Sequence, residues 1–158
     1  VFNLALAASV AGMAKGFVET WTAETIPRRV AGGLVLADDP LTQRRLAEAV
    51  FALDTLLATI RDVVGEVWGA AAVGGAAPDM ATRGAMRWRL NRACELVGDA
   101  TVELYRAASG RCIFLEHPLQ RRFQDIQGGL GHAFLVADPL AKSVGVWLLG
   151  TSTPEMVL

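Results

Sequence analysis

The 158-residue sequence is poor in several residue types, and each scarcity excludes a class of protein. It contains two cysteines, two histidines and one tyrosine, and aromatic residues make up only 7% of the chain. Cys94 and Cys112 form no CxxC pair and have no histidine cluster around them, so the spacing predicts no metal site. We expect both to be buried free thiols in a cytoplasmic protein.

The sequence also lacks an excess of charge of either sign and a long apolar run. Fifteen basic residues stand against sixteen acidic ones, which gives no reason to expect nucleic acid or an anionic membrane as a partner. The longest charge-free run, residues 1–14, is shorter than the roughly 18–20 residues of a membrane span, and no basic segment precedes it as in a signal peptide. Yet 53% of the residues are apolar, so we expect surface to be buried against other domains or subunits.

Apolar residues recur at spacings of three and four in three long segments, the pattern of helices with one buried face. The first segment covers residues 2–25, with a stripe of mainly small residues: Ala7, Ala11, Ala14, Val18 and Trp21. The second begins at Asp39-Pro40, a capping residue before a proline, and its stripe is Leu46, Val50, Leu53, Leu57, Ile60, Val64 and Val67. The third begins near Pro78-Asp79 and ends at Ser109-Gly110, with the stripe Met86, Leu90, Ala93, Val97, Ala100, Leu104 and Ala107.

Two shorter helices are expected to begin at Pro118 and, after a capping Asp138, at Pro139. Leu140, Val144 and Trp147 would form the buried stripe of the last one. The pattern predicts an all-α, antiparallel up-and-down four-helix bundle with additional short helices, a single domain over residues 1–158. The apolar outer faces, including the small-residue stripe of residues 2–25, are where we expect a dimer or tetramer contact or other domains.

His132 is the first candidate for chemistry, because it stands among glycines and apolar residues. A buried imidazole would stay neutral near pH 7 and could accept a proton or donate a hydrogen bond to a developing anion. Its local sequence favours a purely structural histidine, since no second catalytic group stands beside it. Arg28 and Arg29, in a glycine-containing loop, could bind a phosphate, although ordinary loop charges are the simpler interpretation.

Three motifs together resemble a known family. ADDPLTQRRLAEA, LYRAASG and HPLQRRFQD, followed by a histidine seven residues after that Asp, are similar to the C-terminal helical domain of the acyl-CoA dehydrogenase superfamily. The likeness covers essentially the whole chain and is strongest to the flavin-dependent monooxygenase branch. It implies FAD or FMN, reduced by a partner flavin reductase, and O2-dependent hydroxylation of an aromatic or related small molecule.

The resemblance also assigns site residues. His132 stands where these monooxygenases have a histidine, which implies a base that activates the substrate or a group that stabilises the oxygenated flavin. The common glutamate base of the dehydrogenases is replaced by Ala133. Ser109 and Gly110 match a turn, and Arg28 an arginine element, that contact the phosphate or adenosine part of the flavin across a subunit interface.

Two alternatives stay open at this point. One is an acyl-CoA dehydrogenase C-terminal domain, which catalyses flavin-dependent α,β-dehydrogenation, and the other is a non-catalytic helical oligomerisation module. The resemblance further implies that residues 1–158 belong to a longer flavoprotein whose N-terminal helical and middle β domains are not in this sequence. We therefore expect this segment alone to be inactive and to bind flavin weakly.

Overall fold

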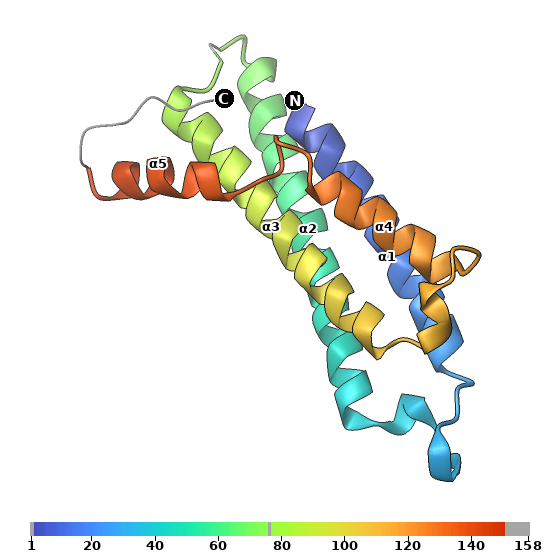
Figure 1. Ribbon diagram of the computed structural model, residues 1–158. Coiled ribbons are helices and arrows are strands. Elements are labelled where there is room, and N and C mark those ends of the chain that lie inside the picture. Colours follow the sequence, from blue (N-terminus) through green and yellow to red (C-terminus); the bar gives the residue numbers. More distant parts are fainter. Residues whose placement is uncertain (1, 76, 151–158) are drawn as a thin grey trace.

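The computed structural model describes residues 2–75 and 77–150, and the regular structure in these ranges is helical (Figure 1). The α-helices are α1 (Phe2–Thr25), α2 (Pro40–Ala72), α3 (Met80–Ala107), α4 (Pro118–Leu130) and α5 (Asp138–Leu148). Three short 3-10 helices lie in the connections: η1 (Ala31–Gly33), η2 (Leu36–Asp38) and η3 (Gly110–Ile113). A single antiparallel bridge between Arg29 and Val35 is the extent of β pairing in the described residues.

The first four α-helices form the predicted bundle. They run alternately in opposite directions, and α1 packs against α2, α3 and α4, while α2 packs against α3 (Figure 1). The shorter α5 leaves the bundle axis and crosses the outside of α3, on which it packs (Figure 1). The prediction of an all-α up-and-down bundle with additional short helices is confirmed.

The centre of the bundle is the small-residue stripe of α1. All five predicted stripe residues are buried, and so are Val10 and Phe17 between them. Alanine side chains allow neighbouring helices to approach closely, which explains how one helix contacts three others. The expectation that this stripe forms an outer contact surface is therefore wrong, because the chain's own helices cover it.

Helix α2 begins where the sequence predicted, but its buried face is displaced. The Asp39 side chain accepts a hydrogen bond from the Thr42 backbone amide and caps the helix. Within the predicted stripe, Val50 is 42% exposed and Val64 46% exposed. The residues one position earlier, Ala49 and Val63, are buried instead. The face turns because α2 must fit against both α1 and α3, a choice that a heptad pattern does not encode.

Helix α3 follows its prediction closely. Asp79 caps it by accepting from the Thr82 amide, and the stripe residues are buried except Ala100 and Ala107, which are half-buried. The helix ends at Ala107, yet Gly110 is not a left-handed C-cap as expected. Gly110 instead begins η3, where the Ser109 hydroxyl accepts from the Arg111 amide.

Helix α4 starts at Pro118 as predicted, whereas α5 starts at Asp138, one residue before Pro139. His117 caps α4 through its Nδ1 atom, which accepts from the Leu119 amide at 3.3 Å. The prediction that Asp138 caps α5 is wrong, because Ala137 occupies the cap position and no side chain supplies the bond. Leu140 and Val144 are buried as predicted, whereas Trp147 is half-buried.

Large apolar side chains remain on the surface, among them Phe51 and Trp68 on α2 and Leu148 on α5. Within the described residues, no helix combines the length and hydropathy that crossing a bilayer requires. Exposed large apolar residues are thus spread over several helices and connections, whereas the predicted stripe of α1 is buried.

Substitution of Trp21 tests how α1 is held in the core. Its indole Nε1–H donates to the Leu104 carbonyl at 2.8 Å, and the side chain is fully buried. We expect Trp21→Phe to lower the free energy of unfolding by about 1–3 kcal/mol, because it leaves a buried carbonyl unpaired and removes packed volume. Urea unfolding followed by circular dichroism measures this loss.

Trp68→Phe is the matched control, since Trp68 is 75% exposed, and it should change stability by less than about 0.5 kcal/mol. Equal effects of the two substitutions would contradict the assigned role of Trp21.

Candidate functional site

A mainly apolar groove lies at the end of the bundle where α1 and α3 begin. We call it the aromatic groove, and its volume is about 580 Å³. Its wall comes from α1, α2, α3 and the segments that precede α3 and α5: Phe2, Asn3, Leu4, Val63, Val67, Ala77, Pro78, Arg83, Met86, Arg87, Leu90 and Phe134. A largely apolar wall with a few polar groups is typical of small-molecule sites.

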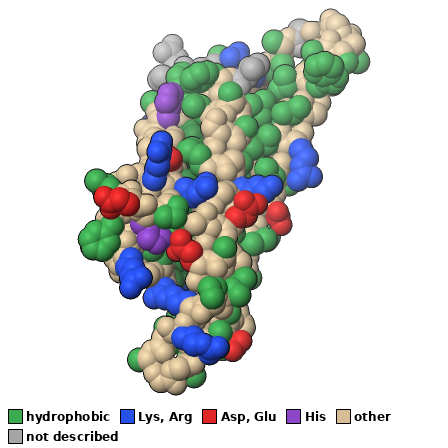
Figure 2. Space-filling model, turned by 90° about the vertical axis from the view of Figure 1, so that its right-hand side faces the viewer, with side chains coloured by type: hydrophobic (Ala, Val, Ile, Leu, Met, Phe, Trp, Pro, Cys, Tyr) green, Lys and Arg blue, Asp and Glu red, His purple; other side chains and the backbone are tan. Residues whose placement is uncertain are grey.

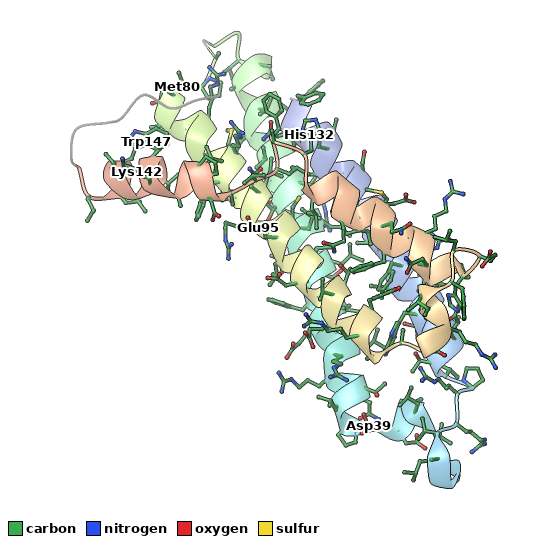
Figure 3. All side chains as sticks on the ribbon, in the orientation of Figure 1. Asp39, Met80, Glu95, His132, Lys142 and Trp147 are labelled. Atoms are coloured by element: carbon green, nitrogen blue, oxygen red, sulfur yellow. The ribbon has the colours of Figure 1, made fainter. Side chains whose placement is uncertain are left out.

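His132 lies at the rim of this groove, in the turn between α4 and α5 (Figure 3). Its ring centre is 5.8 Å from that of Phe2 and 5.7 Å from that of Phe134, and both phenylalanines line the groove. The side chain is exposed, so the prediction of a buried imidazole is wrong. The chain turns outward after α4, and Leu135 and Ala137 are the buried residues of this segment.

The hydrogen bonds of this turn define which nitrogen of His132 is available. The Phe134 backbone amide donates to His132 Nδ1 at 3.2 Å. An acceptor nitrogen carries no proton, so the neutral ring has its proton on Nε2. His132 therefore offers an Nε2–H donor to a molecule in the groove.

Side chains from two helices hold this turn in place. Asn3 of α1 donates through Nδ2 to the Phe134 carbonyl at 2.8 Å, and Asn91 of α3 donates to the Val136 carbonyl at 2.9 Å. Glu95 accepts from the Ala137 amide at 3.3 Å. The position of His132 thus depends on α1 and α3, whose residues are distant from it in the sequence.

Two arginines give the aromatic groove a positive character. Arg83 and Arg87 line it, and the Arg87 guanidinium lies 5.3 Å from the centre of the Phe134 ring. Partial burial of the guanidinium lowers the pKa of Arg87. The groove therefore suits a flat molecule that carries an oxygen or a negative charge.

A second, more polar groove lies where α1 ends and η3 and α4 begin. We call it the arginine groove, and its volume is about 430 Å³. It brings together Arg28 and Ser109, two of the three residues that sequence analysis assigned to cofactor binding. The third, Gly110, follows Ser109 in the sequence. Apart from Gly110 and its two chain neighbours, no described residue has an atom within 4 Å of the position a Cβ would take there, so a ligand can approach its backbone. Arg29 and Arg111 add two further guanidinium groups.

The two grooves are far apart on the chain. Because a helix rises about 1.5 Å per residue, Asn3 in the aromatic groove and Glu24 in the arginine groove lie about 30 Å apart along α1. The two histidines lie at different heights of one face (Figure 2), since His132 lies beside Phe2 at the start of α1 and His117 beside Glu24 in its last turn. The structure thus unites the predicted cofactor residues with one another but not with His132.

Sequence analysis missed several residues of these grooves. Phe2, Arg83 and Arg87 were not predicted as site residues. They lie on α1 and α3 and come near His132 only through the packing of these helices. It also missed a cluster of Glu24, Cys112 and His117 beside the arginine groove. Cys112 and His117 are five residues apart, a weak signal, and Glu24 joins them only through the fold.

Comparison with known proteins places the chain in a family. Residues 4–137 match the family described as acyl-CoA dehydrogenase, C-terminal domain, and the chain belongs to that family. The resemblance noted from the three motifs is thereby confirmed. No curated protein sequence matches the chain significantly.

Solved structures share the fold over nearly the whole chain. 3-HSA hydroxylase from Rhodococcus sp. RHA1 has a TM-score of 0.85 at 22% identity, covering 99% of this chain and 41% of that chain. The HsaA monooxygenase from M. tuberculosis has a TM-score of 0.81 at 25% identity, with 99% and 40% covered. XiaF from Streptomyces sp., solved in complex with FADH2 and glycerol, has a TM-score of 0.87 at 20% identity, again with 99% and 40% covered. The chain spans about two fifths of the length of these structures.

Substitution of Asn91 tests how the turn that contains His132 is held against α3. Asn91 is fully buried, and its amide pairs with the Val136 carbonyl across the α3–α5 contact. We expect Asn91→Ala to lower the free energy of unfolding by about 1–3 kcal/mol and to speed amide hydrogen exchange in residues 132–137. Hydrogen exchange read by mass spectrometry measures the local effect.

Glu95→Gln serves as the comparison, because it keeps an oxygen acceptor for the Ala137 amide and should leave exchange in this turn nearly unchanged. Faster exchange spread evenly over the bundle in Asn91→Ala would argue against a local role.

Proposed function

We propose that the chain is the C-terminal domain of a flavin-dependent monooxygenase that uses reduced flavin and O2 to hydroxylate an aromatic or related small molecule. The observation that carries this proposal is His132, exposed at the rim of the aromatic groove with Nε2 as its available atom. Two of the structural neighbours bear the names hydroxylase and monooxygenase, which supports the same reaction class.

The geometry favours one of the two roles expected for His132. A neutral ring whose Nδ1 accepts from the Phe134 amide donates from Nε2 and does not accept there. His132 would thus donate a hydrogen bond to an oxygen that gains negative charge during the reaction. Phe2 and Phe134 would flank the substrate ring, and Arg83 and Arg87 would favour a substrate with an anionic or phenolic oxygen.

The arginine groove fits the phosphate part of a flavin, FAD or FMN. Three guanidinium groups and the uncovered backbone of Gly110 are suited to a phosphate, and Ser109 adds a hydroxyl. When bound, the reduced flavin supplies the electrons that activate O2. Arg28, Ser109 and Gly110 would hold the phosphate end of the cofactor, and the hydroxylation would take place at the aromatic groove.

The distance between the two grooves favours an assembly of two or more chains. About 30 Å along α1 exceeds the reach of one flavin dinucleotide, so the two grooves of one chain would serve two different cofactor molecules. Each cofactor would then contact two chains, which supports a dimer or tetramer. This arrangement agrees with the subunit-crossing phosphate contact that the resemblance implies.

The proposed enzyme requires further domains and a partner protein. The solvent-facing rim at His132 needs a cover to exclude water, which N-terminal helical and middle β domains would provide. The chain's share of about two fifths of its structural neighbours supports such additional domains. A partner flavin reductase would supply the reduced cofactor, and a cytoplasmic location stays a prediction that rests on the free thiols Cys94 and Cys112.

One observation weighs against the acyl-CoA dehydrogenase alternative. That reaction needs a carboxylate base over the substrate, and no carboxylate is among the described residues that line the aromatic groove. Ala133, at the position of the common glutamate base, is exposed and has no acid–base group. Turnover measurements distinguish the proposed monooxygenase from the alternative of a non-catalytic oligomerisation module.

The first test removes the imidazole from the full-length flavoprotein. We expect His132→Ala to lower kcat by about 100-fold or more, because one positioned donor to developing charge contributes on that order. His132→Gln, which retains an N–H donor, should recover part of the loss. Oxygen uptake and product formation with a phenolic substrate provide the measurement.

Lys142→Ala on the exposed side of α5 is the control and should leave kcat unchanged (Figure 3). Unchanged turnover in His132→Ala would favour the oligomerisation module.

The second test addresses the cofactor. We expect the isolated 158-residue chain to bind FAD and FMN weakly, because it presents each cofactor with only part of a site. In the full-length protein, Arg28→Ala should raise the flavin Kd at least tenfold through the lost phosphate contact. Arg61→Ala, on the exposed side of α2, should leave the Kd unchanged. Stoichiometric tight binding to the isolated chain in a fluorescence titration would contradict the proposal.

A further inference from the structure

Three side chains of types that commonly bind metals lie close together at the C-terminal end of α1. They are Glu24 from the last turn of α1, Cys112 from η3 and His117 from the N-terminus of α4. The Cys112 Sγ atom lies 3.9 Å from His117 Nε2, and Nε2 lies 3.5 Å from a carboxylate oxygen of Glu24. All three ligand atoms lie within 4.8 Å of one another.

We propose that Glu24, Cys112 and His117 form a binding site for a single Zn²⁺ ion. A thiolate, an imidazole and a carboxylate form a mixed set of sulfur, nitrogen and oxygen donors, which suits zinc and not the hard ions Mg²⁺ and Ca²⁺. Three protein ligands leave a fourth tetrahedral position for water or another ligand. This inference does not depend on the flavin proposal.

The distances are close to those of a zinc site. Zinc bonds of about 2.0–2.3 Å at tetrahedral angles place pairs of ligand atoms about 3.3–3.6 Å apart. The separations of 3.5 Å and 3.9 Å need to close by a few tenths of an ångström at most, and the Cys112–Glu24 pair, within 4.8 Å, by about 1 Å. A side-chain rotation of Glu24, which is partly exposed, can supply that movement.

The fold holds two of the ligands firmly. Cys112 is buried, and the Tyr105 hydroxyl donates to its backbone carbonyl at 2.8 Å. His117 is fixed at the start of α4, with a side chain that is 19% exposed. Glu24 and His117 also line the arginine groove, so an ion can enter from that side.

Charge balance is compatible with the ion despite the arginines nearby. Thiolate and carboxylate together neutralise a divalent cation, so the occupied site itself carries no net charge. Burial, together with the Glu24 carboxylate, raises the pKa of the Cys112 thiol, so the metal-free thiol is protonated at neutral pH. Zinc must displace this proton, and binding therefore strengthens as pH rises.

Binding also changes the helix cap. Without metal, His117 Nδ1 accepts from the Leu119 amide at 3.3 Å, so the neutral ring carries its proton on Nε2. A metal on Nε2 moves that proton to Nδ1 or removes it, and a protonated Nδ1 ends the cap bond. Since the bond is long, its loss is a small cost compared with three zinc–ligand bonds.

The test is a Co²⁺ and Zn²⁺ titration of the full 158-residue chain without flavin, with no histidine tag and with a non-thiol reductant. We expect one Co²⁺ per chain, a near-ultraviolet charge-transfer band from the thiolate, and displacement of Co²⁺ by Zn²⁺. Cys112→Ser should abolish the band. Glu24→Gln and His117→Asn should each weaken affinity at least tenfold, and the asparagine can still cap α4.

Cys94→Ser is the matched control, because Cys94 is also buried but lies outside the cluster. Its titration should match that of the unsubstituted chain. No thiolate band with folded protein, a band that survives Cys112→Ser, or a band lost in Cys94→Ser would overturn the proposal. Should Cys112→Ser fail to fold, unchanged affinity in both Glu24→Gln and His117→Asn would overturn it equally. A failed metal titration leaves the flavin proposal untouched, since no flavin is present.

Discussion

The close packing of α1 is the constraint on which the rest of the structure depends. Ala7, Ala11 and Ala14 project almost nothing beyond the backbone, so α2, α3 and α4 can all approach the same helix. Further along, Phe17 and Trp21 fill the space between helices, and Trp21 also pairs with a backbone carbonyl of α3. One buried helix thereby sets the relative positions of the three helices around it.

Because α1 runs the length of the bundle, it also determines where chemistry can occur. Its first residues form one wall of the aromatic groove and contact His132, whereas its last turn supplies Glu24 and leads into Arg28. The rigid helix keeps these two regions apart. A ligand at one end cannot touch the other end of the same chain, which is why the proposed flavin contacts require a second chain.

The sequence predicted helices best where the signal is local. Asp39 and Asp79 cap their helices as expected, because a cap depends on an amide three residues away. The buried stripes of α1 and α3 were also predicted, since helical spacing places their residues on one face. Predictions failed where packing competes with local pattern: Val50 and Val64 face outward, and Asp138 leaves the cap of α5 to Ala137.

By itself, the sequence determined the number, order and approximate limits of the helices, and its motifs identified the family. Those features depend on contacts between residues a few positions apart. Only the tertiary structure decided that His132 is exposed beside Phe2, that Arg28 meets Ser109, and that Glu24 joins Cys112 and His117. Each of these depends on how distant helices pack, and packing is a property of the whole chain that no local spacing contains.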